Sequence, residues 1–312
     1  MGELRKDYIL NRYVIIATER GKRPHQFKNE VDNPMPKKDV FGPGNENETP
    51  QEVYRYPKDS GDWKIRVFPN KYSAVKPEGN NEIKTDNEFF TFSDSYGHHE
   101  VIVETPDINK SLVDLSVQEI SQVFKTFVLR INANLNDPKI KYVTVFKNKG
   151  LGAGCSIKHT HCQLIAYNLV PINIIDKEEA VAKYDYDVYQ KIINIEKNSD
   201  RKCFENKTMV GFTPYASRFP FEIRIFPKRH VLKLDELDEN ELMDMSDILR
   251  SILLKLKELN ADYNFYLHYG IKNMRLHLVV CPRLAKWAGF ELATGTIINS
   301  MPPETAAEFY RG

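Results

Sequence analysis

Apolar and polar positions along the chain show the period of helices and the period of strands, each in two places. Two stretches have the apolar spacing of a helix that buries one face: 120–131 and 242–256. Each follows a capping-box pattern, Ser116 with Glu119 and Asp238 with Glu241, whose side chains satisfy amides that the first helical turn leaves free. We therefore predict two amphipathic helices in equivalent places.

Strand-like runs lie before and after each predicted helix, at a constant offset of 122 residues. Segment 100–103 aligns with 222–225, and segment 142–146 aligns with 264–268. Repetition at a fixed period indicates a duplicated chain. We expect an α+β fold in which mostly antiparallel strands pack against helices in two tandem domains. The expected domains are 1–170 and 171–312.

The two copies diverge after the second strand of each. The first copy has a long glycine-bearing loop, 147–158, and the second copy has a turn six residues shorter. His159 and His161 therefore align with Arg275 and His277. The long loop and the paired histidines occur together, which predicts one working site, in the first half. His277 is expected to be an ordinary hydrogen-bonded histidine of a strand.

Polar side chains follow the long loop with the spacing of a strand. His159, His161 and Gln163 share one face, because successive side chains of a strand point to opposite sides. Three glycines in the loop allow backbone angles that other residues avoid, so the loop can turn its amides toward an anion. We therefore expect a phosphate site beside an imidazole.

Histidine suits group transfer because a neutral imidazole is a nucleophile near pH 7 and leaves readily from phosphorus. We predict that His161 is a covalent nucleophile whose other ring nitrogen bonds to a nearby backbone carbonyl. Gln163 can donate a hydrogen bond to a phosphoryl oxygen but has no proton to release, which favours transfer over hydrolysis. Two histidines on a strand are also typical of half a metal site or of a polar sheet face, and both alternatives stay open.

Charge and cysteine content exclude several classes of protein. Lys and Arg number 44 against 43 Asp and Glu, so no global field attracts nucleic acid or an anionic membrane. The chain has no run of about 18 apolar residues and no apolar leader, so we expect no membrane segment. The four cysteines lack regular spacing and are expected to be reduced, which predicts a cytoplasmic protein.

The site motif resembles that of the galactose-1-phosphate uridylyltransferase family, a branch of the histidine-triad superfamily. The family pattern is Asn-x-Gly, then Gly-Cys/Ala-Ser, then His-Pro-His-x-Gln. The matching positions are Asn148 and Gly150, Gly154-Cys155-Ser156, and His159-Thr-His161-Cys-Gln163. Further similar segments extend the resemblance over nearly the whole chain. It implies two tandem histidine-triad-like domains.

The resemblance implies ping-pong exchange of a nucleotide between a nucleoside diphosphate sugar and a sugar 1-phosphate, through His161, in a homodimer. The implied catalytic group is His161, Gln163, Ser156 and His159. The implied substrate-binding group is Arg20, Arg23, Asn70, Asn148, Gly154, Cys155, Phe290 and Glu291. In the family, the segment of Phe290 and Glu291 reaches the hexose across the dimer interface. From charge alone, Arg20 and Arg23 could equally form a solvated basic turn.

Departures from the family pattern concern metals. Many members bind zinc through two cysteines, a downstream histidine and the first histidine of the motif. The corresponding positions here are Asp39, Gly42, Ile108 and His159. Only the histidine remains, so we expect no zinc site and no other cofactor. Some members bind a second metal in the second half, but Arg275 replaces a histidine there and a guanidinium does not ligate metals.

Three functions follow as hypotheses. The leading one is uridylyl transfer between UDP-glucose and a hexose 1-phosphate, most simply galactose 1-phosphate. Segment 68–71 also resembles relatives that transfer adenylyl groups to phosphate, namely ADP-sugar and dinucleoside polyphosphate phosphorylases. The third hypothesis is an inactive nucleotide-binding regulator, because the metal positions have diverged. The nucleophile and its loop favour the two enzymes.

Overall fold

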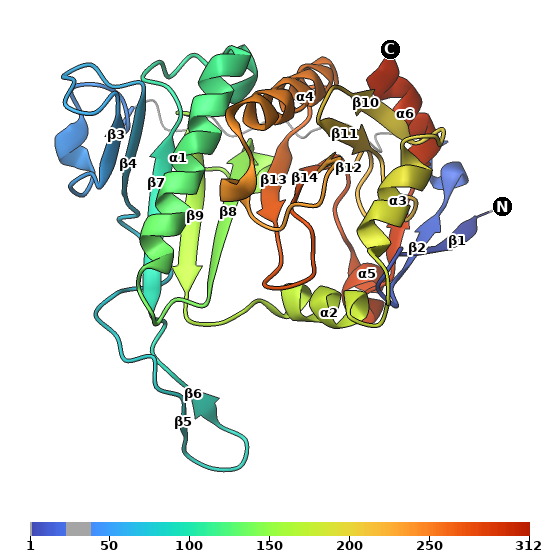
Figure 1. Ribbon diagram of the computed structural model, residues 1–312, viewed down its shortest axis with the longest axis horizontal. Coiled ribbons are helices and arrows are strands. Elements are labelled where there is room, and N and C mark those ends of the chain that lie inside the picture. The colour runs from blue at the N-terminus through green and yellow to red at the C-terminus, as the bar shows by residue number, and fades with distance from the viewer. Residues whose placement is uncertain (1, 23–38) are drawn as a thin grey trace.

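Ten strands from both halves of the chain form one sheet in the computed structural model, which describes residues 2–22 and 39–312 (Figure 1). The strand order is β10-β11-β12-β14-β13-β8-β9-β7-β4-β3, and each pairing in it is antiparallel. The first half contributes β3 (Tyr54–Tyr56), β4 (Ile65–Pro69), β7 (Gly97–Val103), β8 (Tyr142–Lys149) and β9 (His161–Tyr167). The second half contributes β10 (Lys202–Glu205), β11 (Met209–Phe212), β12 (Ile223–Pro227), β13 (Tyr263–His268) and β14 (His277–Pro282). The predicted α+β class with mostly antiparallel strands is confirmed.

Each half arranges its five strands in the same spatial order, outward from the junction of β8 and β13. The long helices α1 (Val117–Leu135) and α4 (Glu239–Glu258) begin 122 positions apart, at 117 and 239, as the sequence offset predicts. Both helices carry the predicted capping boxes, in which Ser116 and Asp238 accept a backbone N–H three residues ahead. The two halves are therefore equivalent in element order, and duplication is our interpretation of that equivalence.

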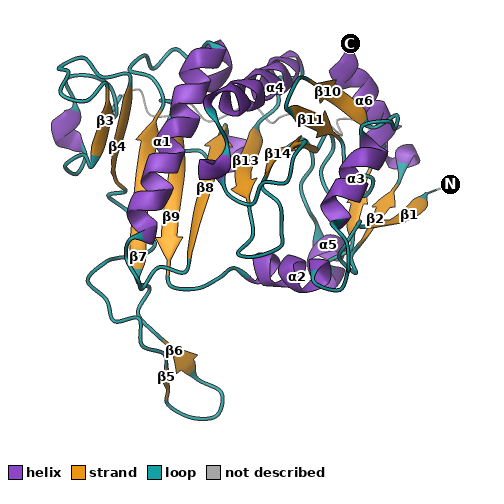
Figure 2. Cartoon of the chain, in the orientation of Figure 1, coloured by secondary structure: helices purple, strands orange, loops and turns teal. Residues whose placement is uncertain are grey.

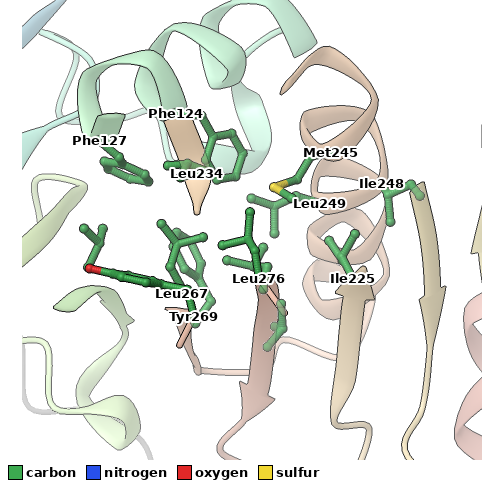
Figure 3. Close-up of a cluster of buried hydrophobic side chains, with 14 of the residues drawn as sticks. Phe124, Phe127, Ile225, Leu234, Met245, Ile248, Leu249, Leu267, Tyr269 and Leu276 are labelled. Atoms are coloured by element: carbon green, nitrogen blue, oxygen red, sulfur yellow. The ribbon is translucent and has the colours of Figure 1, made fainter. Parts of the chain in front are cut away.

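The helices α1 and α4 lie side by side on one face of the sheet (Figure 2). Figure 3 shows their shared core, where Phe124 and Phe127 of α1 and Met245 of α4 point toward Leu267 of β13 and toward Leu276, which directly precedes β14. Each of these five residues is at most 1% exposed. Because this core crosses the junction, burial of apolar surface holds the two halves to each other.

The opposite face of the sheet carries the predicted site in the first half and is covered in the second. The covering helices are α2 (Ile172–Val181) and α3 (Val188–Glu196). Lys177 of α2 contacts His268 of β13, and Tyr189 of α3 packs on Phe226 of β12. The same sheet face is therefore closed in one half and carries the candidate site in the other.

The remaining elements lie around the large sheet. They are a small sheet of β1 (Glu3–Lys6), β2 (Tyr13–Ile16) and β15 (Ile297–Asn299), the hairpin of β5 (Lys84–Thr85) and β6 (Thr91–Phe92), the helices α5 (Gly289–Thr294) and α6 (Pro303–Arg311), and 3-10 turns at Thr18–Lys22, Glu46–Glu48, Leu112–Asp114, Leu151–Ala153 and Leu234–Glu236. The hairpin projects from the body of the molecule (Figure 1). Across 2–22 and 39–312, no helix has the length and apolar character needed to cross a membrane.

Replacing Leu249 by alanine tests the packing of α4. Leu249 is 0% exposed, so truncation removes core contacts and leaves a cavity. We expect the free energy of unfolding to fall by about 2–5 kcal/mol. Leu254→Ala on the same helix, where the leucine is 40% exposed, is the matched control and should cost less than about 1 kcal/mol. Denaturant unfolding followed by circular dichroism measures both, and equal losses would contradict the described packing.

Candidate active site

His161 is the first residue of β9 and lies at the centre of the candidate site. The residue is 8% exposed, and its Nδ1 lies 2.8 Å from the carbonyl oxygen of His159. A carbonyl oxygen can only accept a hydrogen bond, so Nδ1 carries the proton and Nε2 has the lone pair. Burial, together with the positive charge of Lys147, lowers the pKa of His161 to about 4. The predicted bond to a backbone carbonyl is present, and the ring is uncharged at neutral pH.

A small apolar cluster lies beside the His161 ring. Phe41 packs edge-on against it, with 5.3 Å between ring centroids and 84° between planes. Phe41 belongs to a core of its own with four other residues, separate from the large core: Trp63, Phe68, Val101 and Val103. The His161 ring therefore projects from an apolar wall, which explains why burial disfavours its charged form.

Gln163 lies on the same face as His161, two residues further along β9, and its amide is oriented by His99. His99 Nδ1 accepts the N–H of Ala74 at 3.3 Å, so His99 Nε2 is the donor to Gln163 Oε1 at 2.8 Å. Asn70 Nδ2 points at the same oxygen from 3.5 Å. Among the described residues the Gln163 amide nitrogen has no partner, so its N–H groups can meet a phosphoryl oxygen.

Sequence reasoning did not identify His99. Burial lowers the pKa of His99, so its ring is neutral and can accept at one nitrogen while donating at the other. The alternation of β7 carries the signal that could have found it, because His99, Val101 and Val103 share a face and β7 pairs with β9. Asn70, by contrast, was predicted and lies in this cluster.

A buried ion pair lies behind His161, on the helix side of the sheet. Lys147 Nζ is 2.8 Å from both carboxylate oxygens of Glu104, and each side chain is at most 1% exposed. Nζ also donates to Thr160 Oγ1 at 2.8 Å and to the carbonyl oxygen of His161 at 3.1 Å. Burial disfavours the ammonium, but the Glu104 carboxylate keeps the pKa of Lys147 above its ordinary value. The charged network therefore fixes the backbone that carries His161.

His159 differs from its predicted position on the face of His161. The strand β9 begins only at His161, and His159 lies in the preceding turn with 0% exposure. Its Nδ1 is 2.8 Å from Asp39 Oδ1, and its Nε2 is 2.7 Å from the carbonyl oxygen of Thr105. Both ring nitrogens are therefore engaged, and the contribution of His159 to the catalytic group is its carbonyl oxygen, which holds His161.

The glycine loop between β8 and β9 is anchored by Asp262 from the second half. Asp262 Oδ2 accepts the N–H of Gly152 at 2.9 Å. Gly150 has a φ of 85°, and a Cβ there would lie 1.7 Å from Asp262 Oδ1, so only glycine admits the carboxylate. The N–H groups of 153–155 bond to carbonyl oxygens inside the loop. The prediction that the loop turns its amides toward a phosphate is therefore wrong for 152–155, because the protein uses those amides itself.

The other predicted residues near the loop differ in accessibility. Ser156 and Gly154 are exposed, and the Ser156 hydroxyl and N–H have no partner within the described ranges. Cys155 is buried, and its thiol donates to a carbonyl oxygen two residues ahead at 3.1 Å, so it packs into the loop. The Asn148 side-chain oxygen accepts from Asn264 Nδ2 at 2.8 Å, across the junction between the halves.

Arg20, Phe290 and Glu291 lie with the second half. Arg20 follows β2, and Phe290 and Glu291 belong to α5. Burial opposes ionisation of Glu291, but backbone N–H groups and the charge of Arg20 lower its pKa. In Figure 1, β2 and α5 lie on the far side of β13 and β14 from β9. One chain therefore does not bring these three residues to His161, and Arg23 lies outside the described residues.

The second half repeats the hydrogen bond of the His161 ring at a closed position. His277 donates from Nδ1 to the carbonyl oxygen of Arg275 at 2.9 Å, as His161 does to His159. Its Nε2 is buried and has no partner in the described part of the chain. Phe226 stacks on the ring, with 4.6 Å between centroids, and Tyr189 of α3 packs beside it at 6.1 Å. The expectation of an ordinary hydrogen-bonded histidine holds for one nitrogen only, and the other is closed off.

The four positions that relatives use for zinc do not fit a metal here. Gly42 and Ile108 carry no ligand atom, and Asp39 bonds directly to the imidazole of His159. Within 2–22 and 39–312, no group of three or more His, Cys, Asp or Glu side chains could hold a metal ion.

Two family models and several named enzymes are similar to this chain. The family model described as galactose-1-phosphate uridyl transferase, N-terminal domain, matches residues 2–171, and a model of a domain of unknown function, DUF4921, matches 97–309. An ADP-glucose phosphorylase of Arabidopsis thaliana is 32% identical over 99% of this chain and 92% of its own length. A galactose-1-phosphate uridylyltransferase of Thermotoga maritima is 26% identical over 100% of this chain and 98% of its own length.

Solved structures agree with these matches. The crystal structure of an ADP-glucose phosphorylase from Arabidopsis thaliana with bound ADP-glucose superposes with a TM-score of 0.86 at 28% identity, covering 100% of this chain and 98% of that one. A uridylyltransferase structure has a TM-score of 0.77 at 23% identity, covering 100% and 97%, and thus shares the fold. The predicted resemblance and the expectation of a transferase-type enzyme are confirmed. The chain belongs to the galactose-1-phosphate uridylyltransferase family.

Proposed function

We propose that this protein is a nucleotidyltransferase in which His161 Nε2 takes a nucleotide from a nucleoside diphosphate sugar. One observation carries the proposal. The Nδ1–H of His161 donates to a backbone carbonyl oxygen, which leaves Nε2 as the ring nitrogen with a lone pair. Gln163 lies beside it with free N–H donors and no acidic proton, which favours transfer over hydrolysis.

The proposed reaction has two steps. In the first, His161 Nε2 attacks the α-phosphorus of the donor, a P–N bond forms, and the bond to the bridging oxygen breaks, which releases the sugar 1-phosphate. In the second, an oxygen of the acceptor phosphate attacks the same phosphorus, the P–N bond breaks, and the neutral imidazole returns. Gln163 would donate to a non-bridging oxygen that gains negative charge in both transition states.

Two donor and acceptor pairs fit this chemistry. The first is UDP-glucose with a hexose 1-phosphate, the exchange predicted from the motif and named in many relatives. The second is ADP-glucose with inorganic phosphate. Greater similarity favours the second pair, because the Arabidopsis ADP-glucose phosphorylase is 32% identical against 26% for the Thermotoga uridylyltransferase.

We also propose that the working form is a cytoplasmic homodimer. Phe290 and Arg20 are exposed and lie apart from His161 within one chain, so they can serve a site only on a second copy. All four cysteines are free and buried, as suits a reducing compartment.

Covalent transfer is tested by mixing the protein with UDP-glucose or ADP-glucose, without acceptor, and recording the intact mass. We expect a UMP or an AMP adduct, and the base that appears identifies the donor. His161→Ala should form none, whereas His277→Ala should keep the adduct because His277 is closed off. Absence of an adduct with every donor would refute the covalent mechanism.

The pH dependence of adduct formation follows from the environment of His161. A pKa of about 4 means that the imidazole is unprotonated from about pH 5 upward, so the rate should be level between pH 5 and 8. Protonation of Nε2 would remove the lone pair, so the rate should fall only as the pH approaches 4. Rapid-quench measurement with the donor alone is suitable, because no phosphate monoester titrates. A decline centred near pH 6.5 would contradict the described environment.

Complementation tests the proposed dimer. The variants His161→Ala and Glu291→Ala should each lose turnover, and dissociating and reassociating a mixture should restore part of it, because a mixed dimer contains one intact site. Turnover that stays absent in a verified mixed dimer, or a monomer in sedimentation, would exclude the shared site.

A further inference from the structure

A single carboxylate oxygen organises the turn that precedes the 3-10 turn at Glu46–Glu48 and lies beside His161. Asp39 Oδ1 accepts the N–H of Phe41 at 3.1 Å, the N–H of Gly42 at 3.0 Å and the Nδ1 of His159 at 2.8 Å. The backbone carbonyl of Asp39 accepts from Asn45 Nδ2 at 2.7 Å, which closes the turn from the other side. One oxygen that receives three donors is a rigid point of attachment.

The absent side chain of Gly42 belongs to the same arrangement. A Cβ at Gly42 would lie 2.2 Å from Asp39 Oδ2 and 2.9 Å from its Cγ. Any side chain at position 42, including a metal-binding thiolate, is therefore incompatible with the present position of the carboxylate. Two positions that hold zinc in relatives thus form one hydrogen-bonded turn here, in which Asp39 needs Gly42.

The turn reaches the nucleophile by two routes. In the first, Asp39 and Thr105 hold the two ring nitrogens of His159, whose carbonyl oxygen accepts the Nδ1–H of His161. In the second, the Asp39 turn places Phe41 edge-on against the His161 ring. Asp39 Oδ1 is occupied by its three hydrogen-bond partners. Asp39 therefore acts on His161 through its neighbours.

We propose that Asp39 takes the place of a metal ion and positions His161 through His159 and Phe41. This inference rests on the proposed nucleotidyl transfer at His161. In zinc proteins the metal fixes such a histidine by a bond to one ring nitrogen. Here the Asp39 carboxylate holds Nδ1 of His159, so His161 is oriented without a bound metal.

The second half contains the same arrangement around an unreactive histidine. Asp187 binds the guanidinium of Arg275, whose carbonyl oxygen accepts the Nδ1–H of His277. Arg275 is 3% exposed, so this carboxylate also holds a buried partner two residues before a strand histidine. Asp187 provides a matched control, because its loss removes an equivalent anchor far from the reacting group.

The experiment compares Asp39→Ala, Asp39→Asn and Asp187→Ala in the full-length protein. We expect Asp39→Ala to slow adduct formation by about 10–100-fold, the usual effect of losing a partner that orients a ligand histidine. The donor concentration at half-saturation should change little, because Asp39 does not contact the donor. Asp39→Asn keeps an acceptor oxygen and should retain most of the rate. Asp187→Ala should lower Tm at least as much and leave the rate of adduct formation unchanged.

Three results would overturn the proposal. The first is a wild-type rate of adduct formation in Asp39→Ala, and the second is an equal loss of that rate in Asp187→Ala. The third is an effect of Asp39→Ala on the donor concentration at half-saturation alone. Metal analysis adds a fourth: zinc bound at one ion per chain after growth with zinc, together with a rate abolished by a chelator. We expect far less than one ion per chain and no effect of the chelator.

Failure of the proposed function would look different, because the wild-type protein itself would form no adduct. The positioning claim still has its own measurement in that case. The Nδ1–H proton of His159, which faces Asp39, should give a downfield NMR signal. That signal should disappear in Asp39→Ala and persist in Asp187→Ala. Absence of that signal from the wild-type protein would overturn the inference without any reference to activity.

Discussion

The hydrogen bond from His161 Nδ1 to the carbonyl oxygen of His159 decides which ring nitrogen can react, and much of the first half holds its two partners in place. Lys147 fixes the backbone of His161 from the helix side, and Asp39 and Thr105 fix the ring of His159. Burying charged groups costs free energy that an apolar core would not. The place of these charged groups explains their presence. The hydrogen bond between His161 and His159 orients the His161 ring only if the backbone of both residues is held in place.

Much of the fold could be predicted because its signals are short in sequence. The capping boxes at Ser116 and Asp238 and the alternation after His161 involve residues that are close in the chain. The partners that complete the site are not. His99 meets Gln163 across 64 residues, and Asp262 meets Gly152 across 110, so a local pattern can show the strand face of His99 but not the partner in either contact. The glycine loop was assigned to a phosphate because its amides suit an anion, but the anion is the protein's own carboxylate.

Comparison of His161 with His277 separates reactivity from local bonding. Each donates from Nδ1 to a carbonyl oxygen two residues earlier, and each lies at the start of a strand. The difference lies in the surroundings: His277 is packed against Phe226 and Tyr189 with its Nε2 buried, whereas the first half has a long loop beside His161. The same Nδ1 bond is therefore found at a closed position in one half and at the candidate site in the other, which the alignment of Arg275 with His159 could not reveal.

Asp262 and Asn264 give the second half a part in a site that it does not contain. They hold Gly152 and Asn148 of the first half from the strand region at the junction. The second half thus supports the loop of the first half through these two side chains. A substitution at Asp262 or Asn264, more than a hundred residues from His161 in sequence, would therefore disturb the loop beside His161.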